Sequence, residues 1–289
     1  MCIRDRDISL TQGSGDLTLG TISGSTISAL NTGSTATSGI TLNNGAVLTA
    51  SGSGDAIVLS GKRFVNNAGA SALSATNGRW LVWSEDPAND TVGNLGFDFK
   101  QYNLAYGSTP TGTGNGLIYT IAPVLGATLG SVSHVYSGSL NANVSGALTA
   151  TGVLSGDTVT VSASSATFDT KNVATNKTIT ASGLSISATS NNKPVYGYQL
   201  GVSTLTNTAN AITRLSNVTW TGGGDGASWF DAANWAGGAI PDFANVATVV
   251  LPSSAAVNFT NNTGSAVSLN TLSGSNAGLT LAGGTLDIA

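Results

Sequence analysis

Few side chains in this sequence are of types that perform nucleophilic or acid–base chemistry. The only histidine is His134, and a Ser-His-Asp triad would need it beside a nucleophile and an orienting carboxylate. Ser131, Ser133 and Ser137 are near in sequence, but serine is abundant throughout, and no Gly-x-Ser-x-Gly lies at a strand-to-helix turn. We therefore interpret His134 as a polar strand residue, and we expect no enzymatic activity.

Metal ligands are equally scarce. Cys2 and His134 are the only cysteine and the only histidine, and one of each cannot form a zinc site. The run Gly222–Gly226 resembles the Gly/Asp calcium turn of repeat-in-toxin β-rolls, in which successive copies of a nonapeptide share each ion. Because the run occurs once, we interpret it as a flexible turn between two tryptophans. We expect no metal ion and no cofactor.

Acidic residues gather in one segment only. Polysaccharide lyases and hydrolases collect several ionisable side chains in one groove, whereas the 14 acidic residues here are spread thinly. Glu85, Asp86, Asp90 and Asp98 share a region that we interpret as a solvated loop. A carbohydrate-active enzyme is therefore the alternative rather than the leading hypothesis.

Aromatic residues provide the best candidates for ligand binding. Trp229, Phe230 and Trp235 are close enough in sequence to form a platform for sugar rings, and Trp80 and Trp83 are weaker candidates because they lie on a predicted strand. The competing interpretation is packing in a core, where tryptophan is mostly buried. We favour core packing and keep a sugar-binding module as an alternative.

The elements that must position these residues are short strands separated by turn formers. Alternation places one set of side chains inward and the other outward, and Gly, Asn, Ser and Asp tolerate positive φ at corners. Such segments favour stacked solenoid coils over a sandwich of hairpins, because turn residues outnumber strand residues. The predicted strands include Ile8–Leu10, Leu17–Leu19, Ile40–Leu42, Val47–Thr49 and Ile57–Leu59, and the predicted turns include Gly13–Asp16, Asn43–Gly45 and Gly52–Asp55.

Composition supports an all-β chain. Only 8% of the 289 residues are charged, against roughly 25% in an ordinary soluble domain. The polar surface must therefore come from Ser, Thr, Asn and Gly, which suit strands and turns better than exposed helices. The net charge is −4, and the sequence has no cluster of basic residues that could bind the phosphates of a nucleic acid. No apolar run approaches the roughly 20 residues of a transmembrane helix.

The pattern divides the chain into five segments. We expect residues 1–6 to be a non-native leader, since they have neither an apolar core nor a cleavage site and do not match the following rhythm. Residues 7–125 are predicted to form stacked coils with a loop extension, and residues 126–200 a small β module. Residues 201–219 are predicted to be a polar linker, and residues 220–289 a Trp-rich turn region followed by coils that stop within a strand pattern.

Several stretches resemble known families. Phe64–Ala70, Leu73–Ala75 and Gly78–Trp83 are similar to filamentous-haemagglutinin-type exoproteins, which are exported by two-partner secretion or autotransport. Trp220–Pro241 is similar to a segment that precedes autotransporter-associated strand repeats. Four further pieces resemble the small YDG module of the same proteins. Ser137 stands where the Tyr-Asp-Gly triplet that names the module usually has Asp. These pieces are His134–Ser139, Gly156–Val159, Phe168–Val173 and Tyr198–Leu200.

The resemblance implies a right-handed parallel β-helix interrupted by a small module of sandwich or β-grasp type. It implies a fragment of a secreted or surface-exposed bacterial adhesin, acting as a rigid stalk and an interaction surface outside the outer membrane. The implied partners are an outer-membrane transporter and a host-cell receptor, matrix receptor or neighbouring bacterial surface. The motif residues, expected to be structural, are Tyr136, Gly138, Gly156, Asp157, Phe168, Lys171 and Asn172.

Overall fold

The computed structural model describes residues 6–242 and 245–252 with their side chains, and the backbone of five further strands between residues 256 and 288. Residues 1–5 of the expected leader lie outside the described residues. The chain is all-β, as predicted, and the described residues include no α-helix. None of the described residues belongs to a helix with the length and apolar character that crossing a bilayer requires.

The chain divides into two compact units. Unit 1 consists of Met1–Gly126, Ala150–Thr160 and Ile186–Gly201, and unit 2 of Ala127–Thr149, Val161–Ser185 and Val202–Ala289. The strands of unit 1 are β1 (Ile8–Gln12), β2 (Leu17–Leu19), β3 (Ile22–Gly24), β4 (Ile27–Asn31), β5 (Ile40–Leu42), β6 (Leu48–Ser60), β7 (Phe64–Asn66), β8 (Leu73–Ser84), β9 (Phe99–Gln101), β10 (Gly116–Tyr119), β16 (Lys193–Tyr196) and β17 (Gln199–Leu200).

The strands that lie wholly within unit 2 come from the middle and from the C-terminal part of the chain. They are β12 (Ser133–Val135), β18 (Thr204–Thr213), β19 (Leu215–Thr219), β20 (Val246–Leu251), β21 (Ala256–Thr260), β22 (Val267–Leu269), β23 (Leu272–Gly274), β24 (Gly278–Ala282) and β25 (Leu286–Ile288). Four strands contribute to both units, namely β11 (Val124–Leu129), β13 (Leu148–Thr151), β14 (Thr158–Phe168) and β15 (Ala174–Ser190). Short 3-10 helices are η1 (Pro87–Asn89), η2 (Ala232–Asn234) and η3 (Ala236–Gly238).

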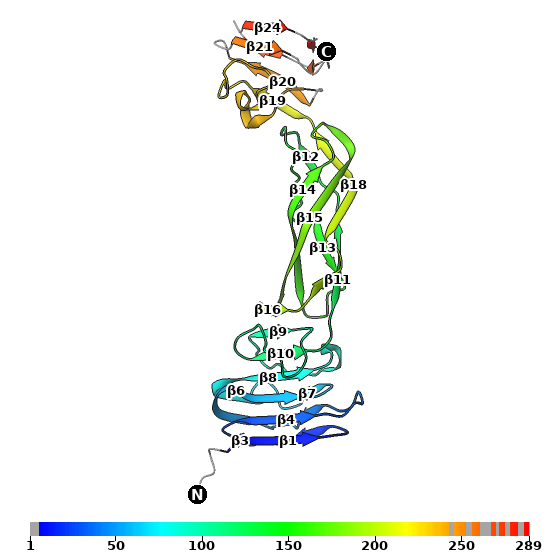
Figure 1. Cartoon of the computed structure of the whole chain (residues 1–289), viewed down its shortest axis with the longest axis vertical. Coiled ribbons are helices and arrows are strands. Elements are labelled where there is room, and N and C mark those ends of the chain that lie inside the picture. Colours follow the sequence, from blue (N-terminus) through cyan, green and yellow to red (C-terminus); the bar gives the residue numbers. More distant parts are fainter. Residues whose placement is uncertain are drawn as a thin grey trace. The chain divides into compact units, whose positions relative to one another are not determined.

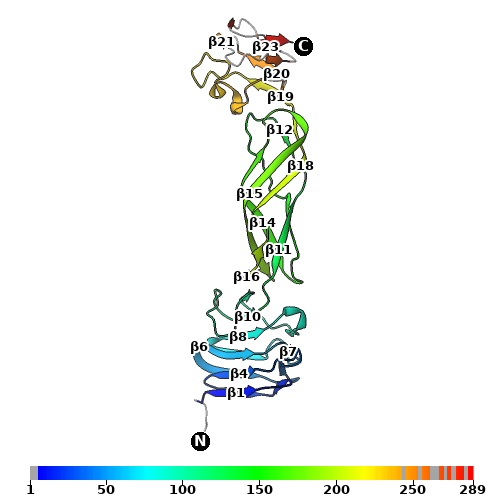
Figure 2. The same cartoon turned by 45° about the vertical axis from the view of Figure 1, so that its right-hand side comes forward.

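Parallel strands in unit 1 pair with strands further along the chain. β1, β4, β6, β8 and β10 form one series, and Figures 1 and 2 show these strands lying one beside the next. β2, β5 and β7 form a second series, and β3 pairs with the first part of β6, which pairs with the first part of β8. Each series keeps its register, as in Ile8↔Ile27 and Ile27↔Ile57.

β6 and β8 are longer than the sequence predicts because the first and second parts of each strand pair in different series. The predicted turn at Gly52–Asp55 lies within β6, where the pairing with β8 shifts register between Ala50 and Ser53 and again between Asp55 and Ile57. Gly54 has φ +71°, a conformation that glycine adopts without a Cβ clash. The glycines therefore bend a continuous strand around a corner instead of ending it.

Apolar ladders fill the interior of unit 1. Alternate residues of β4 are buried, and Ile27 pairs with Ile57, which pairs with Trp80. Ile40 and Phe64 are partners in the second series, and all five of these residues are at most 2% exposed. Burying each such side chain contributes roughly 1.5–3 kcal/mol, so the ladders are the main stabilising feature.

A buried asparagine satisfies the backbone at a corner of this interior. Asn66 is 2% exposed and ends β7. Its Nδ2 donates to the carbonyls of Gly69 and Val92 at 2.9 and 3.0 Å, and its Oδ1 accepts from the N–H groups of Ala68 and Gly69. Asparagine replaces the missing ladder bonds with its own amide.

Unit 2 contains antiparallel pairing around β15. β18 pairs with β15 antiparallel and with β12 parallel, and β14 pairs with β15. Phe168, Ile179 and Ile212 are buried in the core of this unit. Towards the C-terminus, β19, β20 and β23 pair in parallel, as do β21 with β24 and β22 with β25.

The predicted linker over residues 201–219 is wrong. It contains β18 and β19, because alternation continues through its Thr and Asn residues and places Ile212 and Val218 in the core. Asn210 is 1% exposed and donates to the Lys177 carbonyl at 3.0 Å.

Candidate functional site

Asp157 is the centre of a buried polar cluster in unit 1. The preceding Gly156 has φ +83°, a left-handed turn conformation that favours glycine. The Asp157 side chain is fully buried, and its Oδ1 accepts from Lys100 Nζ at 2.9 Å. Its Oδ2 accepts from the Tyr102 hydroxyl at 2.6 Å and the Tyr198 hydroxyl at 2.9 Å. Every oxygen of the carboxylate is therefore occupied by a partner from a distant segment.

The tyrosines around Asp157 are held as hydrogen-bond donors. The Tyr102 ring lies 5.4 Å from that of Tyr119 and 4.9 Å from that of Tyr198. Burial, together with the nearby Asp157 charge, raises the pKa of Tyr198 to about 12. Burial and the bond to Asp157 raise the pKa of Tyr102 even further. Both hydroxyls are protonated at neutral pH and suit a structural role better than that of a base.

A second carboxylate, Asp242, collects the other polar motif residues in unit 2. Its Oδ2 accepts from Lys171 Nζ at 2.8 Å, and its Oδ1 accepts from the Tyr136 hydroxyl at 3.1 Å and from Asn245 Nδ2 at 2.8 Å. Asn245 Nδ2 also donates to Asn172 Oδ1 at 3.0 Å. Burial, followed by the Asp242 charge, raises the pKa of Tyr136. Tyr136, Lys171 and Asn172 are thus brought together.

Asp242 and Asn245 were missed in the sequence. Asp242 is the only charged residue between Asp231 and Asp287. An isolated charge in a long uncharged run is a signal that it has a specific partner. The partner could not be named, because Lys171 lies 71 residues away.

Gly138 lies where two backbones approach closely. It has φ +75°, and a Cβ added there would lie 2.6 Å from the Gly238 carbonyl oxygen and 3.3 Å from Ala239 Cα. No side chain fits without a shift of the backbone. Gly138 therefore has a packing role in unit 2.

His134 contacts backbone and an aromatic ring. Its Nε2 lies 3.1 Å from the carbonyl oxygen and 3.2 Å from the amide nitrogen of Asn143. Its ring lies 5.3 Å from that of Phe168, which is 3% exposed. These contacts fit the interpretation of His134 as a polar strand residue and place Phe168 in the core.

The Asp157 and Asp242 clusters share one chemistry. Each joins an Asp carboxylate to one Lys ammonium and to at least one Tyr hydroxyl, and no described residue has a buried side-chain nitrogen or oxygen without a partner. Removing one partner of a buried ion pair costs about 3–5 kcal/mol, because the remaining charge is uncompensated. The arrangement is suited to fixing distant segments of the chain together.

The proposed sugar platform at Trp229, Phe230 and Trp235 does not form an exposed surface. Trp229 is fully buried and Trp235 is 2% exposed, while Phe230 is partly buried. Trp235 Nε1 donates to the Trp229 carbonyl at 2.7 Å, and Trp229 Nε1 donates to the Pro241 carbonyl at 3.2 Å. The rings pack edge to face at 4.7 Å. Core packing, the interpretation that we favoured, accounts for them because large apolar rings gain most when they are buried.

The glycine-rich turn is organised by an asparagine. Asn234 Oδ1 accepts from the N–H groups of Gly224 and Gly226 at 2.9 and 3.0 Å, and its Nδ2 donates to Asp225 Oδ1 at 2.7 Å. Asp225 Oδ1 also accepts from two backbone N–H groups, which lowers the pKa of its carboxyl. The described residues contain no group of three or more His, Cys, Asp or Glu suited to a metal ion.

The acidic loop contains four carboxylates with separate partners. Glu85 pairs with Lys62 at 3.2 Å, and Asp86 caps η1 by accepting from the Ala88 N–H. Asp98 accepts from the Asn115 N–H and pairs with Lys193 at 3.4 Å. Asp90 accepts from the Phe64 N–H and the Ser84 hydroxyl, both at 2.7 Å. Glu85 and Asp86 line one groove together, but each of the four carboxylates binds its own partner.

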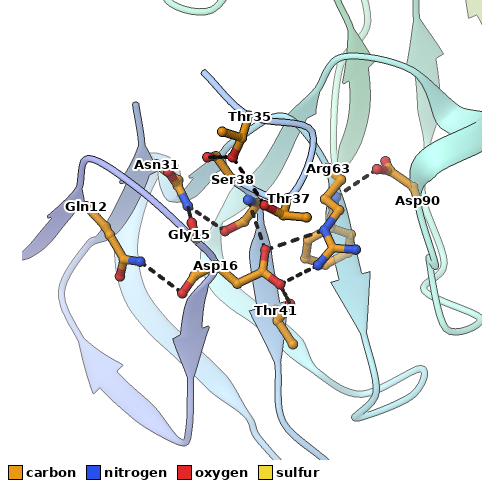
Figure 3. Close-up of polar contacts among 12 residues, drawn as sticks. Gln12, Gly15, Asp16, Asn31, Thr35, Thr37, Ser38, Thr41, Arg63 and Asp90 are labelled. Atoms are coloured by element: carbon orange, nitrogen blue, oxygen red, sulfur yellow. Dashed lines mark hydrogen bonds and ion pairs between the residues drawn. The ribbon is translucent and has the colours of Figure 1, made fainter. Parts of the chain in front are cut away.

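Figure 3 shows a further polar cluster that sequence reasoning missed, centred on Asp16. Arg63 Nη2 donates to Asp16 Oδ2, and Asp16 Oδ1 accepts from the Gly39 N–H at 3.0 Å. The Thr41 hydroxyl lies 3.5 Å from Asp16 Oδ2. Because these residues belong to or precede β2, β5 and β7, the cluster ties the strands of the second series together.

Comparison with known protein families supports the resemblance to the YDG module. A YDG domain is found at residues 120–198, a range that includes the predicted motif residues. No curated protein and no solved structure matches the chain.

Proposed function

We propose that the chain is part of a large bacterial protein that is secreted or displayed at the cell surface, where it acts as a stalk and as an adhesive surface. In this proposal the parallel series of β1–β8 and β19–β25 form right-handed β-helix coils, and the YDG domain interrupts them. The supporting observation is the in-register parallel pairing of strands on both sides of that domain in the sequence.

Parallel stacking supports a stalk because each added coil contacts only its neighbours. The stalk can therefore become longer by adding coils that make the same neighbour contacts as the existing ones. The low charge, 8% of residues, leaves few ionised groups for catalysis. The Asp157 and Asp242 clusters support the same view, since their partners hold segments together and leave no carboxylate oxygen free for a substrate.

The resemblance of Phe64–Trp83 to exported exoproteins supports export through an outer-membrane transporter, by two-partner secretion or autotransport. The proposed partners are a host-cell receptor, a matrix receptor or a neighbouring bacterial surface. We place the alternative, a carbohydrate-active enzyme, second because Glu85, Asp86, Asp90 and Asp98 each bind a separate partner.

Adhesion of coated beads tests the proposal. Beads carrying the purified chain are incubated with epithelial cells, with matrix proteins and with Gram-negative bacteria. A matched control is Leu48→Asp, which introduces a charge at a fully buried core position. Adhesion that exceeds this control supports the proposal. Equal retention on every surface refutes the adhesive role, and release of products from a polysaccharide panel favours the enzyme instead.

A further inference from the structure

A groove crosses the C-terminal ends of β4, β6, β8 and β10 in unit 1. Its volume is about 210 Å³, and its walls include residues that follow these strands in neighbouring coils. Backbone bonds stack the segments: Gly61 N–H donates to Trp83 O, Glu85 N–H to Lys62 O and Thr120 N–H to Ser84 O, all at 3.1 Å. The groove therefore runs along the direction in which the strands pair. Its lining includes Asn31, Ser60, Lys62, Trp83, Glu85 and Tyr106.

An exposed aromatic ring forms one wall of this groove. Tyr106 is 45% exposed, which is unusual for a large apolar side chain in this structure. The Trp83 ring lies 5.7 Å away at 86°. Gly107 has φ +84°, and Ser108 N–H donates to Ala105 O at 3.1 Å, so Tyr106 occupies a tight turn. A ring braced in this way offers contact area at little cost in conformational entropy.

Charged side chains line the same groove as the Tyr106 ring. Lys62 and Glu85 pair at 3.2 Å with side chains that are 37% and 50% exposed. A pair this exposed contributes less than about 1 kcal/mol to stability. Its ammonium and carboxylate can bind hydroxyl groups as donor and acceptor, and together they carry no net charge. The wall therefore suits a ligand that is rich in hydroxyl groups and uncharged.

We propose that this groove binds a linear, uncharged saccharide chain. Paired strands lie about 4.8 Å apart, so the four strand ends span about 14 Å, which suits several sugar units lying along the stack. The volume of about 210 Å³ is below the roughly 300 Å³ of pockets that enclose drug-sized ligands. A chain lying across a shallow groove fits these dimensions better than an enclosed cofactor. The inference rests on the proposed adhesive function and names its ligand class.

Titration calorimetry with defined oligosaccharides tests this site. The purified full chain is titrated with cellohexaose, chitohexaose and maltohexaose, and with hexagalacturonate as a charged comparison. We expect at least one neutral hexasaccharide to bind, and Tyr106→Ala to weaken that binding about tenfold or more. Leu140→Ala is the matched control, because Leu140 is 46% exposed and lies in unit 2; it should bind as the unmodified chain does.

A second variant tests the contribution of the charged pair to binding independently of the Tyr106 ring. Glu85→Gln keeps the shape but removes the charged acceptor, and it should weaken binding about threefold or more. The proposal is overturned if no neutral hexasaccharide binds, if Tyr106→Ala binds as well as the unmodified chain, or if hexagalacturonate binds more tightly. Bead adhesion without saccharide binding rejects the groove alone, whereas saccharide binding without adhesion rejects the adhesive function and keeps the groove.

Discussion

Replacing Asp90 by asparagine is expected to stabilise the chain at neutral pH. Burial, the largest influence, and the Asp86 charge raise the pKa of Asp90 from 3.8 to about 6, against the opposing bonds from the Ser84 hydroxyl and the Phe64 N–H. Asparagine can keep both contacts, since its oxygen accepts from Phe64 and its NH2 group donates to the Ser84 hydroxyl. The variant removes only the cost of ionising a desolvated carboxyl.

The pH dependence follows from proton linkage. The folded state binds the Asp90 proton more tightly than the unfolded state does, so this group lowers the free energy of unfolding as pH rises from 3.8 to about 6. The penalty is about 1 kcal/mol near pH 4.5 and about 3 kcal/mol above about pH 7. Asp90→Asn removes this penalty, so it should raise the free energy of unfolding at both pH values. The gain above about pH 7 should be larger than the gain near pH 4.5 by about 2 kcal/mol.

Urea unfolding, followed by tryptophan fluorescence at both pH values, measures this difference. Asp55→Asn is the control, because it removes a carboxylate that is 46% exposed and pairs with Arg79, and it should change stability by less than about 1 kcal/mol at either pH. A gain for Asp90→Asn that is the same at both pH values would refute the reasoning, since the ionisation of Asp90 would then cost nothing.

Three further substitutions test the packing and the polar clusters by urea unfolding. Trp229→Ala should lower the free energy of unfolding by about 3–5 kcal/mol, because it empties a fully buried site, and a loss below 1 kcal/mol would contradict that burial. Gly138→Ala should cost more than about 1 kcal/mol, given φ +75° and a Cβ 2.6 Å from the Gly238 oxygen. Asp157→Asn should cost about 3–5 kcal/mol by leaving Lys100 uncompensated; a neutral result would show that the pair is dispensable.

The exposed Lys193–Asp98 pair provides the control for the Asp157 substitution. Both side chains are 47% exposed, so Asp98→Asn should cost less than about 1 kcal/mol. Equal losses for the two aspartates would contradict the distinction between buried and exposed pairs.

Strand positions were predictable where alternation and turn residues agree. β2 and β5 have the predicted bounds, Leu17–Leu19 and Ile40–Leu42, because two inward side chains flank one outward residue. Ile57–Leu59 and all of Val47–Thr49 except Val47 lie in the single strand β6, Leu48–Ser60, because a glycine corner within a strand has the same local sequence as a turn. The local sequence cannot distinguish a corner within a strand from a turn between two strands, because the difference depends on whether a neighbouring strand pairs on both sides of the glycines.

The candidate site was predictable only as separate pieces. The turn at Gly156 marked Asp157, but its partners Lys100 and Tyr102 lie 57 and 55 residues away. Nothing in the local sequence of Lys100 distinguishes it from a surface lysine. The burial of Trp229 agrees with the general preference of tryptophan for cores, whereas Tyr106 is 45% exposed in a turn packed against Trp83, a contact that its local sequence does not indicate.

The variable spacing between paired strands has a consequence for protein engineering. Ile27 follows its partner Ile8 by 19 residues, and Ile57 follows Ile27 by 30, yet the ladder continues because the extra residues lie at the corners between paired strands, some of them between β4 and β5. Ser34–Thr37 are exposed there. A foreign peptide grafted at these positions would extend a corner that already varies in length, so the chain offers a display site that leaves its interior unchanged.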